Sequence, residues 1–478
     1  MNCKIALYGF GSLPVVYRHL IELAVAEKTP INWCVILTTP NYREIMGEVL
    51  PKADILDVFQ TLPRVPVGGN LSCLAGYPGS LVEDLAAQKR ARRKRTRDWL
   101  HNRGIDYYKL YKSFLIDRGA THILMSGIET PDAKIAVAAA QELGLGIIAP
   151  VDLRNLTGTF FSKNAYETPP NYALANPTLR VQAAQFVNEF RQSAAPARAL
   201  PADFECAADD HTVLPDYLPP LWKRLAGFVG TVAERPDIFD HDLVRVSVMN
   251  NFDLLRTTIR GVRARRNAPQ YDIADVNELP ERFIFYPLQY TPESSINVPA
   301  PYFVDQLRVV DAVRYSMPSD YTLVLKEHPA CVEMRPVAFM RRLRTFPGVT
   351  VVKATIPSTD VIRRAALTVT VTGTAALEAL LLGRPALVLG PGLPAWALGH
   401  RASVGRLREE IPRAVQTPPT DDFVIEQIAR LLSVRYPFYF STAHLPGEPM
   451  LRLGNMRRFL KALTHHLDRE RSLKEHAA

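Results

Sequence analysis

Residues 367–390 read LTVTVTGTAALEALLLGRPALVLG, and this stretch decides the fold of the chain. Its first segment, Leu367 to Val371, is apolar and β-branched, which is typical of a buried strand. A segment with the apolar spacing of a helix follows, and Gly383 with Pro385 ends it before a second apolar run, Ala386 to Leu389. Strand, helix and strand in this order predict one unit of a parallel sheet.

The turn between the first strand and the helix carries groups that suit a nucleotide. The hydroxyls of Thr372 and Thr374 flank Gly373, and the N–H groups that open a helix attract a phosphate. Glu378 follows one turn later, where its carboxylate could accept both hydroxyls of a ribose. The alternative is structural, with Thr374 as a helix cap and Glu378 as an acid that complements the helix dipole. The first interpretation predicts a nucleotide at the carboxyl end of a sheet.

Length and composition set the outer limits. A chain of 478 residues exceeds the size of a single hydrophobic core and indicates two main domains. The content of 47% hydrophobic and 22% charged residues is that of an ordinary globular protein. A net charge of +9 favours anionic partners such as nucleotides, acidic glycans, lipid headgroups or nucleic acid, and does not choose among them.

The cysteines are scattered and form no Cys-x-x-Cys pair, so neither a zinc knuckle nor a disulfide framework is predicted. They are Cys3, Cys34, Cys73, Cys206 and Cys331. We therefore expect a reduced, cytoplasmic setting. Arg18 and His19 fall where a signal peptide would still be apolar, and no apolar run is long enough to span a bilayer. Any membrane contact is expected to be peripheral, at the inner membrane.

The first part of the chain, residues 1–170, alternates strands and helices and predicts a Rossmann-like domain. Its first turn, Gly9-Phe10-Gly11, lacks the third glycine of the dinucleotide fingerprint, and no acid ends the second strand. A dinucleotide cofactor is therefore not expected. Glu129 follows a predicted strand and is the acid of this domain best placed to face a cleft; an exposed loop acid is the alternative.

A basic run, Lys89 to Arg97, contains seven lysines and arginines. One interpretation is a solvated helix face. The other is a dock for anionic lipid headgroups or for an anionic acceptor, which the nearby Trp99, Tyr107 and Tyr108 support because such side chains favour interfaces. No nucleic-acid-binding motif accompanies the run, so we expect no nucleic-acid partner.

Residues 171–275 are expected to be a helical bridging region, 276–445 a second Rossmann-like domain, and 446–478 a C-terminal helix. Three strand ends of the second domain carry polar residues. They are Gln289, Glu293, Ser294 and Ser295 after Arg282–Tyr286; Lys326, His328 and Pro329 after Tyr321–Lys326; and Thr372, Gly373, Thr374 and Glu378 after Leu367–Val371. In a parallel sheet all three ends lie at one edge, so we expect these residues to converge there.

The residue types at these strand ends suit group transfer. Lys326 can neutralise a phosphate or a sugar carboxylate as a compact cation. His328 can donate to a leaving phosphate, and the proline after it fixes the turn that aims it. Glu293 could serve as a base, a nucleophile or an acceptor for a hydroxyl.

The three segments Pro287–Ser295, Lys326–Pro329 and Val371–Gly390 resemble the signature segments of the capsule polysaccharide biosynthesis family. These bacterial glycosyltransferases include the β-Kdo transferases. In the first domain only Gly158–Ser162 is similar to a segment of that family. The resemblance implies an α/β fold of GT-B type, in which two Rossmann-like domains face each other across a cleft and the C-terminal domain binds the nucleotide.

The resemblance also implies roles for single residues. Residues 289–295 would line the donor-sugar side of the cleft, His328 and Pro329 would meet the donor phosphate, and Thr372, Thr374 and Glu378 would hold the nucleotide phosphate and ribose. The Kdo enzymes carry an acidic pair where this chain has Pro292-Glu293, and Arg-Pro where it has Lys326-Glu327. These departures leave open which sugar is donated and whether Glu293 or Glu129 is the catalytic acid.

The leading hypothesis is a metal-independent glycosyltransferase without a bound cofactor, since no Asp-x-Asp occurs in a suitable context. It would transfer a sugar from a nucleotide-sugar donor, for example one like CMP-Kdo, to a surface polysaccharide or lipid-linked glycan acceptor. Two alternatives stay open. One is a nucleotide-sugar 2-epimerase on the same fold, which has no use for the basic run. The other is a non-catalytic subunit of glycan assembly.

Overall fold

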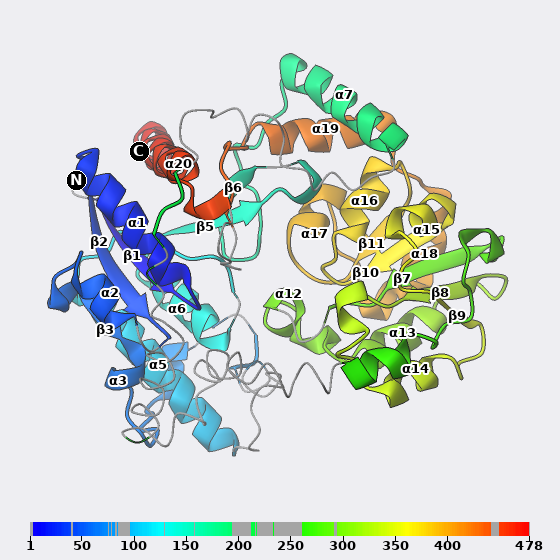
Figure 1. The fold of residues 1–478 in the computed structure, drawn as a ribbon, viewed down its shortest axis with the longest axis horizontal. Helices are drawn as coiled ribbons and strands as arrows, with labels where there is room; N and C mark the ends of the chain where they lie inside the picture. The colour runs from blue at the N-terminus through cyan, green and yellow to red at the C-terminus, as the bar shows by residue number, and fades with distance from the viewer. Residues whose placement is uncertain are drawn as a thin grey trace. The chain divides into compact units, whose positions relative to one another are not determined.

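The computed structural model divides into two compact α/β units (Figure 1). It describes residues 3–39, 42–74, 76, 77, 79–81, 84, 96–128, 130–156, 158–193, 212–215, 217, 233, 261–290, 294–440 and 449–477. The first unit extends to Glu167 and includes the chain from Arg435 onward. The second contains residues 168–193 and 261–434. Glu129, Glu293, residues 89–95 of the basic run and residues 194–210 of the expected bridging region lie outside the described residues.

The first unit is built on a six-stranded sheet in the order β3-β2-β1-β4-β5-β6. Its strands are β1 (Cys3–Gly9), β2 (Ile31–Leu37), β3 (Ile55–Asp57), β4 (His122–Leu124), β5 (Gly146–Asp152) and β6 (Thr159–Ser162). All neighbours are parallel except β5 and β6, which are antiparallel. The order of the parallel strands is that of a Rossmann-like sheet, as predicted. β3 and β6 were not predicted as strands.

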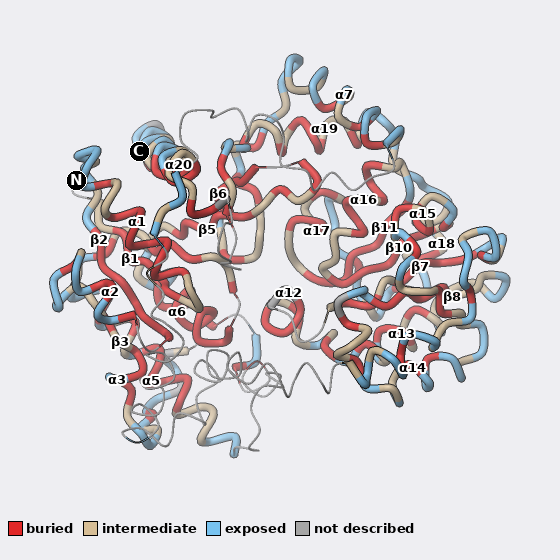
Figure 2. Tube along the Cα trace, in the orientation of Figure 1, coloured by how far each residue is buried: buried red, intermediate tan, exposed pale blue. Residues whose placement is uncertain are grey.

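Helices cover this sheet. They are α1 (Leu13–Ala26), α2 (Arg43–Gly47), α3 (Val58–Thr61), α5 (Arg97–Asp117), α6 (Pro131–Glu142) and the C-terminal α20 (Leu453–Ala477). α20 belongs to the core of the first unit, since Phe459 and Leu463 lie in one apolar cluster with Leu7 of β1 and Val16 of α1. The chain enters this unit where Tyr436 forms an antiparallel bridge to Thr159 of β6. Figure 2 shows the buried strands and the exposed outer sides of the helices.

The second unit has a five-stranded, fully parallel sheet in the order β11-β10-β7-β8-β9. Its strands are β7 (Phe283–Pro287), β8 (Thr322–Lys326), β9 (Val349–Val352), β10 (Leu367–Thr370) and β11 (Ala386–Val388). Counted along the chain from β7, this order is 5-4-1-2-3, which is the order of a Rossmann-like sheet read from its other edge. The Rossmann-like fold predicted for this part of the chain is therefore confirmed, and β7, β8, β10 and β11 fall on runs that the sequence analysis predicted as strands.

Alternate residues of these strands face two separate apolar clusters. Ile284 and Tyr286 lie in one cluster with residues of α13, α14 and α18, whereas Phe283 and Phe285 lie in the other with residues of α15 and α16. The helices of this unit are α7 (Pro177–Ser193), α12 (Ser294–Asn297), α13 (Gln306–Arg314), α14 (Val337–Leu343), α15 (Ser358–Arg364), α16 (Ala375–Leu381), α17 (Leu393–Leu398), α18 (Leu407–Gln416) and α19 (Asp421–Leu432). Arg180 of α7 holds α19 through ion pairs to Asp422 and Glu426. Among the described helices, none combines the length and apolar character needed to cross a bilayer.

Candidate functional site

The carboxyl edge of the second sheet brings the three predicted segments together. β7 lies between β8 and β10, with Pro287 in register with Lys326, so the ends of these strands are neighbours. The Gln289 side chain donates from Nε2 to Thr370 Oγ1 at 2.9 Å, which joins the segment after β7 to the end of β10. Ligands of open α/β folds bind at this edge, where the strand order reverses between β7 and β10.

Lys326 is the last residue of β8 and is only 5% exposed. No hydrogen bond or ion pair of its ammonium occurs among the residues that the structure describes. Burial lowers its pKa below the ordinary 10.5, while the charges of Glu378 and Glu327 act in the opposite direction. A buried cation without a direct partner is costly for the fold, so this position suits an anion supplied from outside.

The turn after β10 is built for close approach. Gly373 donates its N–H to Thr370 Oγ1 at 3.2 Å, and a Cβ at Gly373 would lie 2.6 Å from that same oxygen. A larger residue would therefore displace the turn. Thr372 has a buried hydroxyl with no hydrogen-bond partner among the described residues. Thr374 precedes α16 and makes no capping hydrogen bond with its side chain, so the structural alternative for this threonine has no contact to support it.

Glu378 lies in the first turn of α16 and is half-buried. Its carboxylate is near enough to Lys326 to act on the pKa of that lysine. α16 has seven residues, so it has fewer aligned peptide dipoles than a long helix.

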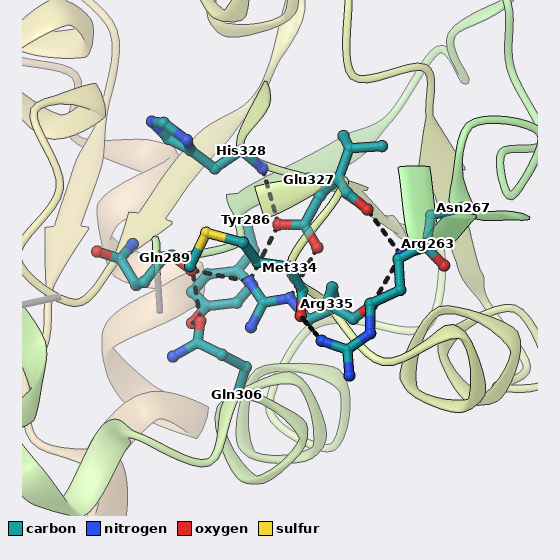
Figure 3. Close-up of polar contacts among 10 residues, drawn as sticks. Arg263, Asn267, Tyr286, Gln289, Gln306, Glu327, His328, Met334 and Arg335 are labelled. Atoms are coloured by element: carbon teal, nitrogen blue, oxygen red, sulfur yellow. Dashed lines mark hydrogen bonds and ion pairs between the residues drawn. The ribbon is translucent and has the colours of Figure 1, made fainter. Parts of the chain in front are cut away.

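Glu327, the residue after Lys326 in the chain, forms a buried ion pair with Arg335 (Figure 3). Arg335 donates from Nε to Glu327 Oε2 at 2.8 Å and from Nη2 to Glu327 Oε1 at 3.0 Å, with side-chain exposures of 6% and 4%. Glu327 Oε1 also accepts the backbone N–H of His328 at 2.9 Å. Arg335 Nη2 donates further to the backbone oxygen of Gln289 at 2.8 Å. The pair thus bonds to the chain that follows β7 and to the chain that follows β8.

The segment after β7 is held by a second amide. Gln306 Oε1, at the start of α13, accepts from Tyr286 Oη at 2.7 Å and from the Gln289 N–H at 3.1 Å. Gln289 is 7% exposed, and its side-chain Nε2 donates hydrogen bonds to Thr370 Oγ1 and to the Pro287 oxygen. Its contacts within the protein position the edge of the sheet.

Asn267 fixes the turn that carries Arg335. Its Nδ2 donates to the Val332 oxygen at 2.7 Å and to the Arg335 oxygen at 2.8 Å. In Figure 3 the His328 ring points away from the Glu327–Arg335 pair. His328 is exposed and its ring meets that of Tyr290 edge to face, 5.4 Å between centroids. The imidazole is therefore accessible to a ligand, whereas the His328 backbone is tied to the interior.

The structure describes all of the predicted site residues except Glu293 and Glu129. Gln289, Lys326, His328, Pro329, Thr372, Gly373, Thr374 and Glu378 follow the strand ends as predicted. Ser294 and Ser295 open α12, and Glu293 and Glu129 lie outside the described residues. The sequence analysis missed Arg335, Gln306 and Thr370. The sequence contained one weak signal for Arg335. Glu327 departs from the family pattern, and Arg335 follows it eight residues later as a possible counter-ion.

The carboxyl edge of the first sheet has a different character. Asp132, at the start of α6, is fully buried and accepts from Tyr8 Oη and, at 3.3 Å, from Tyr111 Oη. Burial raises the pKa of this carboxyl, and the tyrosine hydroxyls oppose the rise. Lys134 pairs with Asp84, which also accepts from Tyr77 Oη at 2.6 Å. These buried groups satisfy one another within the protein.

The part of the chain that carries this site resembles a known protein family. Residues 250–439 match the model of the capsule polysaccharide biosynthesis protein family. This part of the chain is therefore similar to that family. The match covers the second sheet from β7 to β11, with Lys326, Arg335 and the turn before α16. The resemblance to the capsule polysaccharide biosynthesis family that the strand-end segments indicated is thereby confirmed. No curated protein sequence matches the chain.

The solved structures that match this chain have low identity to it. UDP-GlcNAc 2-epimerase from Methanocaldococcus jannaschii is 14% identical, over 91% of this chain and 99% of that one, with a TM-score of 0.24. The β-Kdo 2,4 transferase KpsC from Thermosulfurimonas dismutans is 13% identical, over 65% and 88%, with a TM-score of 0.32. UDP-GlcNAc 2-epimerase from Neisseria meningitidis, bound to UDP-GlcNAc, is 12% identical, over 98% and 99%, with a TM-score of 0.27. These likenesses carry no argument about activity.

Proposed function

We propose that this protein is a glycosyltransferase of capsule polysaccharide assembly, with its nucleotide-sugar donor bound at the carboxyl edge of the second sheet. The family match supports the assembly pathway. The GT-B arrangement, the absence of a required metal, and a donor such as CMP-Kdo are parts of the same proposal. A glycan or lipid-linked glycan would be the acceptor.

One observation carries the proposal. Lys326 is buried at the strand ends, and its ammonium has no hydrogen-bond or ion-pair partner among the described residues. Leaving such a charge unpaired destabilises a protein unless a ligand compensates it. A donor phosphate would be that ligand, and it would also give a partner to the buried hydroxyl of Thr372.

The remaining roles follow from position. Glu378 would accept the ribose hydroxyls, since its carboxylate is near Lys326 and half-buried. His328, exposed beside the same strand end, would donate to the departing phosphate, and Lys326 would neutralise the charge that develops there. Gln289, Ser294 and Ser295 would border the sugar, and either Glu293 or Glu129 would be the catalytic acid.

A thermal-shift screen against CMP, UDP, GDP, ADP and NAD tests the proposal. A ligand that binds only the folded state raises the unfolding midpoint by mass action. We expect a shift with CMP, UDP or GDP, and none of that size for a Lys326→Met variant. No shift with any of the five compounds would contradict donor binding and would favour the non-catalytic alternative.

The products then separate the two enzyme classes. Incubation with the bound nucleotide-sugar and an acceptor glycan should give the extended glycan and the free nucleotide. A 2-epimerase would instead change the donor alone, without any acceptor. An epimerised sugar formed in the absence of acceptor would overturn the transferase proposal.

The basic run Lys89–Arg97 is proposed to contact an anionic surface at the inner membrane. Its lysines and arginines would be attracted to acidic headgroups, and salt would screen that attraction. Charge reversal at Arg92, Arg93 and Arg95 should weaken sedimentation with vesicles that contain acidic lipids. Equal sedimentation of wild type and variant would favour the solvated-face interpretation.

A further inference from the structure

One side chain joins strand ends that the sequence keeps far apart. Among the described residues, Arg335 donates three side-chain hydrogen bonds, two to the Glu327 carboxylate and one to the Gln289 oxygen. Glu327 in turn accepts a hydrogen bond from the His328 N–H. The guanidinium thus contacts the chain after β7 and, through the carboxylate, the chain after β8 (Figure 3).

The same chain of bonds reaches the third strand end. Gln289 donates from its amide to Thr370 Oγ1, and that hydroxyl oxygen accepts the Gly373 N–H. A displacement of Gln289 would therefore shift Thr370 and the turn that precedes α16. Within the described residues, these hydrogen bonds connect Arg335 to the His328 N–H on one side and to the Gly373 N–H on the other.

The chemistry of this link is specific to arginine. The planar guanidinium places two N–H groups against one carboxylate and keeps a further N–H for the Gln289 oxygen. A lysine at the same position would keep the positive charge and lose this fork. Glu327 is 3% exposed and adjacent to Lys326, so without Arg335 its negative charge would be buried beside the cation that the donor phosphate needs.

We propose that Arg335 is a positioning residue of the donor site, which holds the strand ends in one arrangement and neutralises Glu327 so that Lys326 stays available to the donor. This inference rests on the proposed function. Arg335 itself is buried behind the edge and is assigned no contact with the reacting atoms. Its effect passes through Glu327 and Gln289.

The test compares Arg335→Lys with a matched control, Arg314→Lys. Arg314 lies on α13 of the same unit and pairs with Asp311 at 2.8 Å, and within the described part of the chain it makes no hydrogen bond or ion pair to the strand ends. We expect kcat/KM for the nucleotide-sugar to fall about 100-fold in Arg335→Lys, the loss typical of small misplacements in a site, and to stay near wild type in the control. The unfolding midpoints of the two variants should be similar.

A double variant separates neutralisation from packing. Arg335→Met should be less active than Arg335→Lys, because it leaves the Glu327 charge without a counter-ion. Arg335→Met with Glu327→Gln removes that charge and keeps an acceptor for the His328 N–H. We expect the double variant to recover at least about tenfold in kcat/KM over Arg335→Met, which is about 1.4 kcal/mol. A purely structural role would leave the double variant as impaired as the single one, and that result would overturn the electrostatic half of the inference.

Hydrogen exchange gives a readout that needs no substrate. In Arg335→Lys, exchange should accelerate in peptides that contain His328 and Gly373, and stay unchanged in the control variant. An unchanged rate at Gly373, or faster exchange with wild-type kcat/KM, would overturn the inference while leaving the proposed function intact. A wild-type protein that binds no nucleotide would instead overturn the proposed function, and the donor-site role of Arg335 with it.

Discussion

Each of the two sheets has a buried lysine near its carboxyl edge, and the two lysines differ in what surrounds them. Lys134 of the first unit is 4% exposed, pairs with Asp84, and lies 4.9 Å from the centre of the Tyr77 ring. Lys326 of the second unit is 5% exposed, and the described residues give its ammonium no such partner. A buried charge that the chain itself compensates serves the fold, whereas one left to the solvent edge is available to a ligand.

The acids near the two lysines also have different surroundings. Asp132 of the first unit is bonded by two tyrosine hydroxyls, in a cluster that also contains the Tyr107 ring beside Tyr111. Glu378 of the second unit is half-buried, and its negative charge acts on the pKa of Lys326. The two units share a sheet order and differ in the partner of their buried lysine, while the second unit also contains one satisfied buried pair, Glu327 with Arg335. The comparison therefore predicts that substitution of the lysine will damage stability in the first unit and ligand binding in the second.

The largest expected effect is on stability, from Lys134→Met. This variant leaves the Asp84 carboxylate, 1% exposed, without its counter-ion, and the cost of such a buried charge is about 3–5 kcal/mol of unfolding free energy. Urea unfolding followed by fluorescence would measure it. Nucleotide affinity, measured on the folded fraction, should stay at the wild-type value.

The paired variant Lys134→Met with Asp84→Asn is the control. It removes both charges and keeps an acceptor for Tyr77 Oη, so most of the lost stability should return. A loss in the single variant of less than about 1 kcal/mol, in the range of a surface pair, would contradict the structural role of Lys134.

The next largest effect is expected on catalysis, from Lys326→Met. Removing one preorganised charge from a developing anion typically costs about 3–4 kcal/mol, or roughly 10²–10³ in kcat/KM. The unfolding midpoint should be equal to that of the wild type or higher, because the variant no longer buries an unpaired charge. Steady-state kinetics and a thermal scan of the same preparation would show whether the effects separate.

Lys353→Met is the matched control, since Lys353 belongs to the same unit and lies 5.7 Å from the centre of the Tyr271 ring. It should leave kcat/KM unchanged. If Lys326→Met instead lowered stability and spared turnover, the contrast between the two lysines would be reversed.

A somewhat smaller loss, about 3 kcal/mol or less of transition-state stabilisation, is expected for His328→Ala. The imidazole is exposed, so the substitution should leave the fold intact, and its donor role predicts a fall in kcat with little change in KM. His400→Ala, another exposed histidine of the second unit, is the control. Unchanged turnover in His328→Ala would remove this side chain from the mechanism.

The sequence was sufficient to predict the sheets and most strand ends, because both are local patterns. β7 to β11 are apolar runs, and Lys326 and Thr372 follow such runs directly. The role of Arg335 is not local. Its turn is placed by Asn267, which is 65 and 68 residues away along the chain from the two carbonyls that it binds. No spacing rule within the sequence encodes that contact.

The place of α20 was hidden for a similar reason. The sequence analysis predicted a C-terminal helix at residues 446–478 and set it apart from both domains. The structure places Phe459 beside Phe161 of β6, with ring centroids 6.4 Å apart, in the core of the first unit. Which apolar surface accepts a C-terminal helix depends on the other elements that leave a surface uncovered, and a helical pattern alone does not contain that information.

The smallest effect, and the most direct measure of how available Lys326 is, concerns pH. Burial lowers the pKa of Lys326 below 10.5 in the free protein, and a bound phosphate should raise it again by stabilising the charged form. Below the lowered pKa the lysine is protonated with or without ligand, so affinity should be constant. Above it the free protein has lost the proton that binding requires, and affinity should fall by up to about tenfold, or 1.4 kcal/mol, per pH unit.

The stability of the free protein should change in the opposite sense over the same window. Between the lowered pKa and 10.5 the unfolded state binds more protons at this residue, so the contribution of Lys326 to stability rises with pH. Calorimetric titration of the nucleotide into wild type and Lys326→Met, in steps from about pH 7 to pH 10, would isolate this residue. The wild-type affinity should decline on the alkaline side and that of the variant should not. If the affinities of wild type and variant changed with pH in the same way, Lys326 would either stay protonated throughout or make no contact with the phosphate. The difference between Lys326 and Lys134 would then have no consequence for ligand binding.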